Sequence, residues 1–521
     1  MNVVAAAANS GTPWLSIAGG IPLLGAIVVA LLPVRLAKVT TLLFSVVDLI
    51  WVIVMATQFN PSGPTYQLTE QYSWIPQFGV HYALGVDGIA LVLIGMTAVL
   101  MPVVVLASWH DADNAKRSPR VYLSLMLVLD TMMIVTFAAT DVFLFYVFFE
   151  GMLVPMYFMI GSFGVGQRQY ASVKFLLYGL LGGLLMLVAL LALYVYSGES
   201  AATGHHGTFL LYTLTHVVLS STVQKWLFLG FFIAFAIKAP LWPFHTWLPD
   251  AAASAQPGAA VLMLGVMDKV GTFGMIRYCL ELFPSGFHYF TPLILVLSVI
   301  SIIYGAIVAI GQTSMKRLIG YTSISHFGFI VLGIFALTSQ GAAGAALYMV
   351  NHGFATGALF LIAGFLIVRR GSDKISDYGG VQKVAPVLAG LFLVTSLAGL
   401  ALPGLNTFVS EFLVLAGTFS RYKVAGSFAV SGIILASIYM LWLYQRTMTG
   451  PTVESVKAMP DLRVRELLAV VPLVALIIGI GVYPKPVLDV INPAVKATMS
   501  QVGSADPVPA HPAAAQNGAQ P

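Results

Sequence analysis

The sequence predicts an all-α polytopic membrane protein, and three observations lead to that class. Of its 521 residues, 59% are hydrophobic and only 9% are charged, whereas a soluble domain has about 25% charged residues. Apolar runs of roughly 20 residues recur along the chain, which is the length that an α-helix needs to cross the ~30 Å hydrocarbon core. These runs are continuous and do not alternate, so they do not fit the strands of a membrane β-barrel.

We expect about 14 transmembrane helices, since that many apolar runs have spanning length. They lie at 15–33, 38–57, 88–108, 120–139, 141–162, 174–197, 224–242, 258–280, 290–312, 318–338, 343–368, 385–418, 425–446 and 465–483.

The loops indicate how these spans are oriented. If the N-terminus is outside, most lysines and arginines fall in inner loops, while the long loops 58–82 and 198–222 carry none and fall outside. Basic loops stay in the cytoplasm. We therefore expect a multi-pass protein of the bacterial cytoplasmic (inner) membrane with both termini outside.

Two of the predicted helices contain a break next to an ionisable residue. The seventh breaks at 239–243, beside Lys238, and the twelfth breaks at 402–404, close to Glu411. Five spans separate the two breaks, so the segments around them have opposite orientations, as in transporters with inverted repeats. The sequence thus predicts two inverted five-helix repeats with broken seventh and twelfth helices.

The expected organisation follows from these breaks. Residues 1–119 hold helices 1–3, residues 120–283 and 284–449 form the first and second repeats, and residues 450–499 hold a C-terminal helix. The end of the chain, 500–521, is rich in Ala, Pro and Gln and is expected to be disordered.

The seventh and eighth runs each place one lysine deep among apolar neighbours, Lys238 and Lys269. A charged lysine at the bilayer centre costs a few kcal/mol, and desolvation disfavours its ammonium form. Pro240 and Pro243 interrupt the helix beside Lys238. Non-helical backbone at membrane depth is tolerated only where it is buried in protein or lines a water-filled cavity. The pattern predicts an ion pathway.

Other ionisable residues lie in the same runs. Glu150 follows Asp141 by nine residues, which places it roughly 13 Å into the bilayer, where it can pair with a lysine; a purely structural ion pair is the alternative. His326 and His352 suit a proton relay because histidine both donates and accepts near neutral pH, although a lone buried histidine is more often a core residue.

Two further residues are secondary candidates for a proton path. Asp130 lies mid-span in the fourth run. A structural carboxylate that only hydrogen-bonds to a neighbouring helix is the alternative, because it would look the same in the sequence. Lys174 opens the sixth run. It could take part in proton entry, but a lysine that anchors the helix by extending its ammonium group to the membrane surface explains its position equally well.

No sequence motif predicts a nucleotide site, a zinc site or a haem site. The single cysteine, Cys279, excludes a disulfide within the chain and is expected to be a small core residue.

Six motifs, taken together and in order, resemble the antiporter-like membrane subunits of respiratory complex I, NADH:quinone oxidoreductase. The resemblance runs from about Leu84 to Gln445. Within that family it is to the subunit M group, similar to mitochondrial chain 4, because Glu411 stands where the sister subunits typically have lysine. The motifs are FLFYVFFEGMLVPMYFMIG, KAPLWPFHTWLPDA, MDKVGTFGMIRY, KRLIGYTSISHFGF, NHGFATGALFLIAG and LPGLNTFVSEFLVL.

The resemblance implies proton translocation coupled to quinone reduction. It implies that Glu150 is the charge partner of Lys238, that Lys269 carries the proton toward the centre, and that Glu411 is the terminal site. His326 and His352 would form the central relay. It also implies that this chain holds no cofactor, while FMN, iron–sulfur clusters and quinone belong to partner subunits: L-like and N-like neighbours in the lipid bilayer, and a peripheral arm.

The chain departs from the family pattern at a few positions. Asp268 replaces a usually apolar residue beside Lys269, and it alters the protonation of that lysine if both face one cavity. Ala252, Ser254 and Gln256 stand where the family usually has a histidine and its neighbours, so no role is carried over to that loop. A subunit of a multi-subunit sodium/proton antiporter is the alternative function, and a purely structural subunit is a second.

Overall fold

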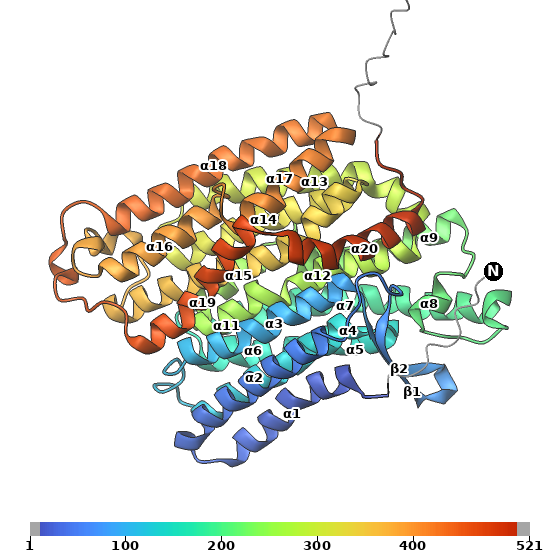
Figure 1. Cartoon of the computed structure of the whole chain (residues 1–521), viewed down its shortest axis with the longest axis horizontal. Helices are drawn as coiled ribbons and strands as arrows, with labels where there is room; N and C mark the ends of the chain where they lie inside the picture. The colour runs from blue at the N-terminus through green and yellow to red at the C-terminus, as the bar shows by residue number, and fades with distance from the viewer. Residues whose placement is uncertain (1–10, 508–521) are drawn as a thin grey trace, which may run out of the picture.

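The computed structural model describes residues 11–507, and in this part long helices pack side by side in one bundle (Figure 1). Helices α1 and α2 lie along one edge in this view and α18 lies along the opposite edge. Twelve segments are long and apolar enough to cross a membrane. They are α1 (Trp14–Leu31), α2 (Val34–Ala56), α3 (Gly88–Ala107), α4 (Pro119–Ala138), α5 with α6 (Val142–Gly151, Leu153–Phe163), α7 (Arg168–Glu199), Pro257–Leu280, α13 (Pro284–Ile310), α14 (Met315–Phe335), α15 (Ser339–Arg370), α18 (Lys423–Met448) and α19 (Val464–Val482).

The two remaining predicted spans are the broken ones, so each of the predicted runs has a helical counterpart. Helix α9 (Ser221–Lys238) ends at Lys238, and α10 (Trp247–Ser254) continues after eight residues without helix. Helix α16 (Pro386–Gly399) ends before Pro403, and α17 (Asn406–Arg421) follows it. The predicted breaks are therefore present, and the inverted relation between the two repeats stays a prediction.

The first break keeps its freed backbone groups bonded. The Trp247 indole donates to the Ile237 carbonyl oxygen at 2.9 Å, and the Trp242 backbone N–H donates to Ser301 Oγ at 2.7 Å. An unsatisfied backbone group inside a bilayer costs several kcal/mol. Side chains of α10 and α13 therefore make it possible for α9 to end at Lys238.

The eighth predicted span is helical but irregular. It consists of α11 (Pro257–Leu262), a π-helical segment η3 (Met263–Met267), α12 (Lys269–Gly274) and a second π-helical segment η4 (Met275–Leu280). Single π turns within α-helices occur mostly at functional sites. The first of these π segments ends directly before Asp268 and Lys269.

A two-stranded hairpin follows α2, and the all-α prediction missed it. Strands β1 (Gln67–Ile75) and β2 (Val80–Val86) are antiparallel and are joined by η1 (Pro76–Phe78). The buried Glu70 carboxylate accepts the Leu15 backbone N–H at 2.7 Å, which attaches the hairpin to α1. The residues of β1 are mostly polar, so the segment lacks the alternation of apolar and polar residues that predicts a strand.

The C-terminal part also differs from the prediction. Two helices occupy it, α19 and the amphipathic α20 (Lys485–Val502), where one was expected. The disordered tail was predicted from residue 500, which is wrong for its first part. The helix runs to Val502 and ends at Gly503, whose φ of +71° is a left-handed cap. Ser504 Oγ then donates to the Leu337 carbonyl oxygen at 2.9 Å. Residues 508–521 lie outside the described part.

Short helices complete the loops. They are η2 (Ala201–Thr203), α8 (Leu211–Leu214), η5 (Ile375–Asp377), η6 (Val381–Lys383) and η7 (Glu454–Val456).

Burial separates the core of the bundle from its outer layer. The best spanning window is 100% buried in Pro257–Leu280 and 94% buried in both α14 and α15, but only 28% buried in α2. The outer helices expose apolar side chains, as lipid-facing helices do. The three buried segments carry Lys269, His326 and His352, so these residues lie in the centre of the bundle and away from lipid.

Candidate functional site

A row of polar side chains, all buried except the half-buried Glu150, runs through the centre of the bundle, and we call it the central polar row. Helices α5, α9, α12, α14, α15 and α17 each contribute at least one member. Its members are Glu150, Lys238, Asp268, Lys269, His352, His326, Tyr348 and Glu411.

Lys269 lies at the middle of the row and is fully buried. Its ammonium donates to the Leu264 carbonyl oxygen, which lies in the π-helical segment, and its Nζ lies 2.7 Å from His352 Nδ1. The Phe327 ring lies beneath it, 5.2 Å away at its centroid. The nearest acceptors of Lys269 are thus a carbonyl and an imidazole, so its proton has a titratable partner at hydrogen-bond distance.

The two histidines follow next in the row. The rings of His352 and His326 lie 5.2 Å apart at their centroids and are nearly perpendicular. His326 Nε2 lies 3.2 Å from the carbonyl oxygen of Gly399, the last residue of α16. Because α16 breaks there, this carbonyl is free to accept. Within residues 11–507, His352 Nε2 and His326 Nδ1 have no hydrogen-bond partner.

Two tyrosines connect His326 to Glu411. The Tyr348 hydroxyl donates to Glu411 Oε2 at 2.8 Å, and the Tyr439 hydroxyl lies 3.5 Å from His326 Nε2. Tyr348 precedes His352 by four residues on α15, so both project from one face of that helix. Glu411 is 4% exposed on α17, the second half of the broken helix.

The other end of the row holds Glu150, Lys238 and Asp268. Lys238 is 3% exposed, and its Nζ donates to the Phe149 carbonyl oxygen at 3.3 Å. Its charge interacts with that of Glu150 and with that of Asp268, but in the described residues no ion pair closer than 4.0 Å joins Lys238 to either. Both Asp268 oxygens are buried and unpartnered. Asp268 also interacts electrostatically with Lys269, so its charge is felt by both lysines.

A glycine makes room for Glu150. A Cβ added at Gly183 of α7 would overlap the Glu150 carboxyl group. The Glu150 side chain therefore lies directly against the α7 backbone, in space that no other residue at position 183 would leave free.

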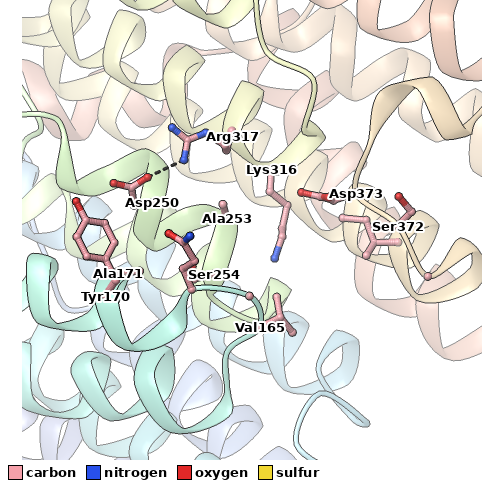
Figure 2. A pocket seen from close by; sticks show the side chains of 14 residues that line it. Val165, Tyr170, Ala171, Asp250, Ala253, Ser254, Lys316, Arg317, Ser372 and Asp373 are labelled. Carbon is pink, nitrogen blue, oxygen red and sulfur yellow. Dashed lines mark hydrogen bonds and ion pairs between the residues drawn. The ribbon is translucent and has the colours of Figure 1, made fainter.

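A polar cleft of about 540 Å³ opens at the end of the bundle where α14 begins. Figure 2 shows Arg317 reaching Asp250 on one side while Lys316 extends across the middle. The Asp250 carboxylate holds Arg317 at 2.6 Å and Lys174 at 2.8 Å. Lys174 therefore lies in an ion-pair network at this cleft, apart from the central polar row.

Of the three residues that depart from the family pattern, one lines this cleft. Ser254 lines it, the Gln256 side chain donates to the Phe163 carbonyl oxygen at 2.9 Å, and Ala252 is buried. In the loop after α3, Asp111 accepts the Gly258 backbone N–H at 3.2 Å, and burial raises the pKa of Asp111 to about 6. A carboxyl group that titrates near neutral pH thus lies at this end of the bundle.

Asp130 does not join the central polar row. It lies on α4, fully buried, and its carboxyl group interacts electrostatically with that of Asp48 on α2. The row and this pair are therefore two separate groups of titratable residues.

Sequence reasoning missed three residues of the site. His245 lies in the first break, 2% exposed, with both ring nitrogens unpartnered. Tyr348 carries a sequence signal, its spacing of four from His352. Tyr439 carries none, because only the packing of α18 brings it to His326. Among residues 11–507, no three His, Cys, Asp or Glu side chains are placed to hold a metal ion.

The two broken helices, with a buried lysine beside one and a buried glutamate beside the other, define an antiporter-like membrane subunit. A family model described as NADH:quinone oxidoreductase/Mrp antiporter, TM, matches residues 139–436. A second, described as NADH-ubiquinone oxidoreductase chain 4, amino terminus, matches residues 29–136. The chain belongs to this family, in its subunit M or chain 4 group, and is a multi-pass membrane subunit of NADH:quinone oxidoreductase.

Individual relatives agree with this family. The chain is 53% identical to NADH-quinone oxidoreductase subunit M of Mycobacterium tuberculosis over 96% of this chain and 97% of the relative. It is 40% identical to subunit M of Rhodobacter capsulatus, over 88% and 90%. A chain of respiratory complex I from Thermus thermophilus superimposes with a TM-score of 0.86 at 31% identity, covering 94% of this chain and all of that one.

The fold extends beyond this enzyme. A chain of the Mrp complex from Dietzia has a TM-score of 0.80 at 21% identity, covering 92% of this chain and 52% of that one. At that identity the likeness shows the fold alone.

Proposed function

We propose that this chain moves protons across the membrane through the central polar row, coupled to quinone reduction in partner subunits. One observation carries the proposal: Lys269, His352 and His326 are in direct contact, and the row continues through Tyr348 to Glu411. Buried ionisable residues are costly in a membrane, and a scaffold has no need for a contiguous set of them.

The central transfer starts from the ammonium group of Lys269. Its proton passes to His352 Nδ1, 2.7 Å away, and leaves neutral lysine and a charged imidazole. The ring then releases a proton from Nε2. Because His352 Nε2 and His326 Nδ1 are both unpartnered, they are the nitrogen atoms between which the next transfer takes place. Histidine accepts at one nitrogen and releases from the other, so the charge moves without the rings leaving their helices.

Glu411 is the terminal site of this path. The Tyr348 hydroxyl bonds the Glu411 carboxylate, and a hydrogen bond to the charged form favours ionisation. A proton that arrives from His326 neutralises Glu411, and its release restores the charged, hydrogen-bonded form.

Glu150, Lys238 and Asp268 control the protonation of Lys269 in this proposal. Asp268 interacts with both lysines. A shift of Lys238 toward Glu150 removes its charge from Asp268 and leaves the Asp268 carboxylate to hold the Lys269 ammonium. The opposite shift weakens that hold and sends the proton on to His352. Energy from quinone reduction would act through these charges.

The setting belongs to the same proposal. The chain lies in a bacterial cytoplasmic membrane with both termini outside, between L-like and N-like subunits, and the peripheral arm and other partners hold FMN, iron–sulfur clusters and quinone. The alternative, a sodium/proton antiporter subunit, has less support, because whole-length identity reaches 53% with subunit M and the antiporter complex shares only the fold.

The test replaces Lys269 in the intact complex. Lys269→Ala should assemble, because alanine is small and helix-favouring, and proton pumping by reconstituted complex should fall about 10-fold or more. Lys423→Ala is the matched control, since Lys423 is an exposed lysine at the start of α18. An assembled Lys269→Ala complex that pumps at the wild-type ratio of protons to quinone would contradict the proposal.

A further inference from the structure

A second pair of buried titratable groups lies outside the central polar row. Asp48 on α2 and Asp130 on α4 are both 0% exposed. Helices α2 and α4 pack against each other, and the two carboxyl groups interact electrostatically. None of the four carboxyl oxygens has a hydrogen-bond partner among the described residues.

The surrounding helices supply no counter-charge. Helices α1 and α3, which pack on α2 and α4, contain no lysine, arginine or histidine. Lys38 on α2 is ten residues from Asp48, roughly 15 Å along the helix, and is paired with Asp113 at 2.6 Å. Arg35 is farther along α2, and Arg120 is ten residues from Asp130 on α4.

The other elements packed on α4 do not neutralise the pair either. Helices α5 and α12 carry Glu150 and Lys269, and strand β2 carries His81. No hydrogen bond or ion pair in the described part joins these groups to Asp48 or Asp130. Two ionised carboxylates without a cation would each cost several kcal/mol in such an interior, and two carboxylates that share a buried site do not both ionise readily.

We propose that Asp48 and Asp130 form a proton-binding site in which the two carboxyl groups share a proton through a hydrogen bond between them. One carboxyl is then the donor and the other the acceptor, so one oxygen of each carboxyl gains a hydrogen-bond partner. The ligand is a proton and no metal ion, since within residues 11–507 no third His, Cys, Asp or Glu side chain is placed with these two carboxylates to hold a metal ion, and two carboxylates do not complete a cation site.

The polar face of α2 indicates the side from which the proton comes. Thr41, Ser45 and Asp48 are all buried on one face of α2, and Thr41 lies about 10 Å from Asp48 toward the Val34 end. Each hydroxyl donates to a carbonyl of its own helix, Thr41 to Ala37 and Ser45 to Leu42, so its oxygen remains able to accept. The row formed by Thr41, Ser45 and Asp48 runs toward the end of α2 that carries Arg35 and Lys38, so the proton comes from that end.

This proposal does not depend on proton pumping through the central polar row, and its test reads protonation directly. The experiment is infrared difference spectroscopy of the reconstituted complex between pH 6 and pH 9, in the carbonyl-stretch region of protonated carboxyl groups. The variants are Asp48→Asn and Asp130→Asn. Asp489→Asn is the control, because Asp489 is a surface carboxylate paired with Lys485.

We expect each pair variant to lose part of the protonated-carboxyl absorbance, and the control to keep all of it. Retention of the full wild-type absorbance in both Asp48→Asn and Asp130→Asn would overturn the proposal. Assembly is informative too. An asparagine amide donates to the remaining carboxyl as the shared proton did, so both variants should assemble, and failure of both to assemble would also overturn it.

Discussion

At the scale of single residues, the central members of the polar row lie next to groups that can exchange or hold a proton. Lys269 has His352 at 2.7 Å, and Glu411 has the Tyr348 hydroxyl at 2.8 Å. Neither lysine of the row forms a close ion pair with a carboxylate in the described structure. A lysine held by a close carboxylate keeps its proton, so this arrangement favours transfer over permanent charge.

Replacing Glu411 tests the terminal site. Glu411→Ala removes the carboxyl group that accepts the last proton, so pumping should be abolished or strongly reduced, whereas Glu411→Lys should retain part of it because lysine also binds a proton. Both are measured as protons translocated per quinone reduced in reconstituted complex. If Glu411→Ala assembles and pumps at the wild-type ratio, the proton leaves by another route.

Tyr348→Phe tests the hydrogen bond that favours ionised Glu411. A hydrogen bond to a charged group contributes about 1.5–3 kcal/mol, so its loss should hold Glu411 in the protonated form and slow proton release roughly 10-fold or more. The measurement is the rate of proton release by reconstituted complex. Tyr212→Phe, at a tyrosine that is 53% exposed, is the control. Equal release rates in Tyr348→Phe and wild type would exclude this role.

At the scale of elements, two irregular segments each supply a polar group that a regular helix would keep for itself. The end of α16 frees the Gly399 carbonyl for His326, and the π-helical segment before Lys269 presents the Leu264 carbonyl to its ammonium. Helix α7 has a glycine at position 183, and the missing side chain leaves room for Glu150. The breaks are therefore part of the site as well as interruptions of the helices.

Gly183→Ala tests the contact between α7 and Glu150. Its Cβ would overlap the Glu150 carboxyl, which must move, so coupled quinone reduction and pumping should fall, as we also expect for Glu150→Gln. Gly95→Ala on α3 is the matched control, because its Cβ meets nothing within 4 Å and alanine is favoured in a helix. Activity of reconstituted complex is the measurement. Wild-type pumping in both Gly183→Ala and Glu150→Gln would show that Glu150 plays no part in coupling.

At the scale of the whole molecule, buried ion pairs attach the outer elements to the central helices. Arg277 in η4 holds Asp87, the N-cap residue of α3, at 3.0 Å, and both are nearly fully buried. Arg369 at the end of α15 holds Glu466 of α19 in a two-pronged contact. These pairs fix where the hairpin and α19 sit on the core.

Asp87→Ala should destabilise the fold. Removing one partner of a buried ion pair costs up to about 3–5 kcal/mol. Arg277 keeps only the more distant Glu281 carboxylate, at 3.9 Å, so the thermal unfolding midpoint of the purified complex should fall. Asp489→Ala, which removes an exposed partner of Lys485, should leave the midpoint unchanged. An Asp87→Ala complex as stable as the wild type would show that the Arg277 charge finds another partner.

Reading the sequence alone was enough to recognise the class of protein, the position of the spans and every member of the row except Tyr348. Apolar runs of spanning length and the cost of a buried charge are local properties, so Lys238, Lys269 and Glu411 could be singled out without a fold. The breaks were equally readable, because Pro240, Pro243 and Pro403 act on their own helix.

Only the tertiary structure decided which of these residues meet. Contacts such as Lys269 to His352 and Tyr439 to His326 join helices far apart in the sequence, and their packing has no local signal. The hairpin at Gln67–Val86 was missed because pairing between its strands, and the bond from Glu70 to α1, stabilise a segment with little apolar alternation. Asp130 could be flagged from its depth, but its partner Asp48 lies 82 residues away, and only the packing of α2 on α4 brings the two together.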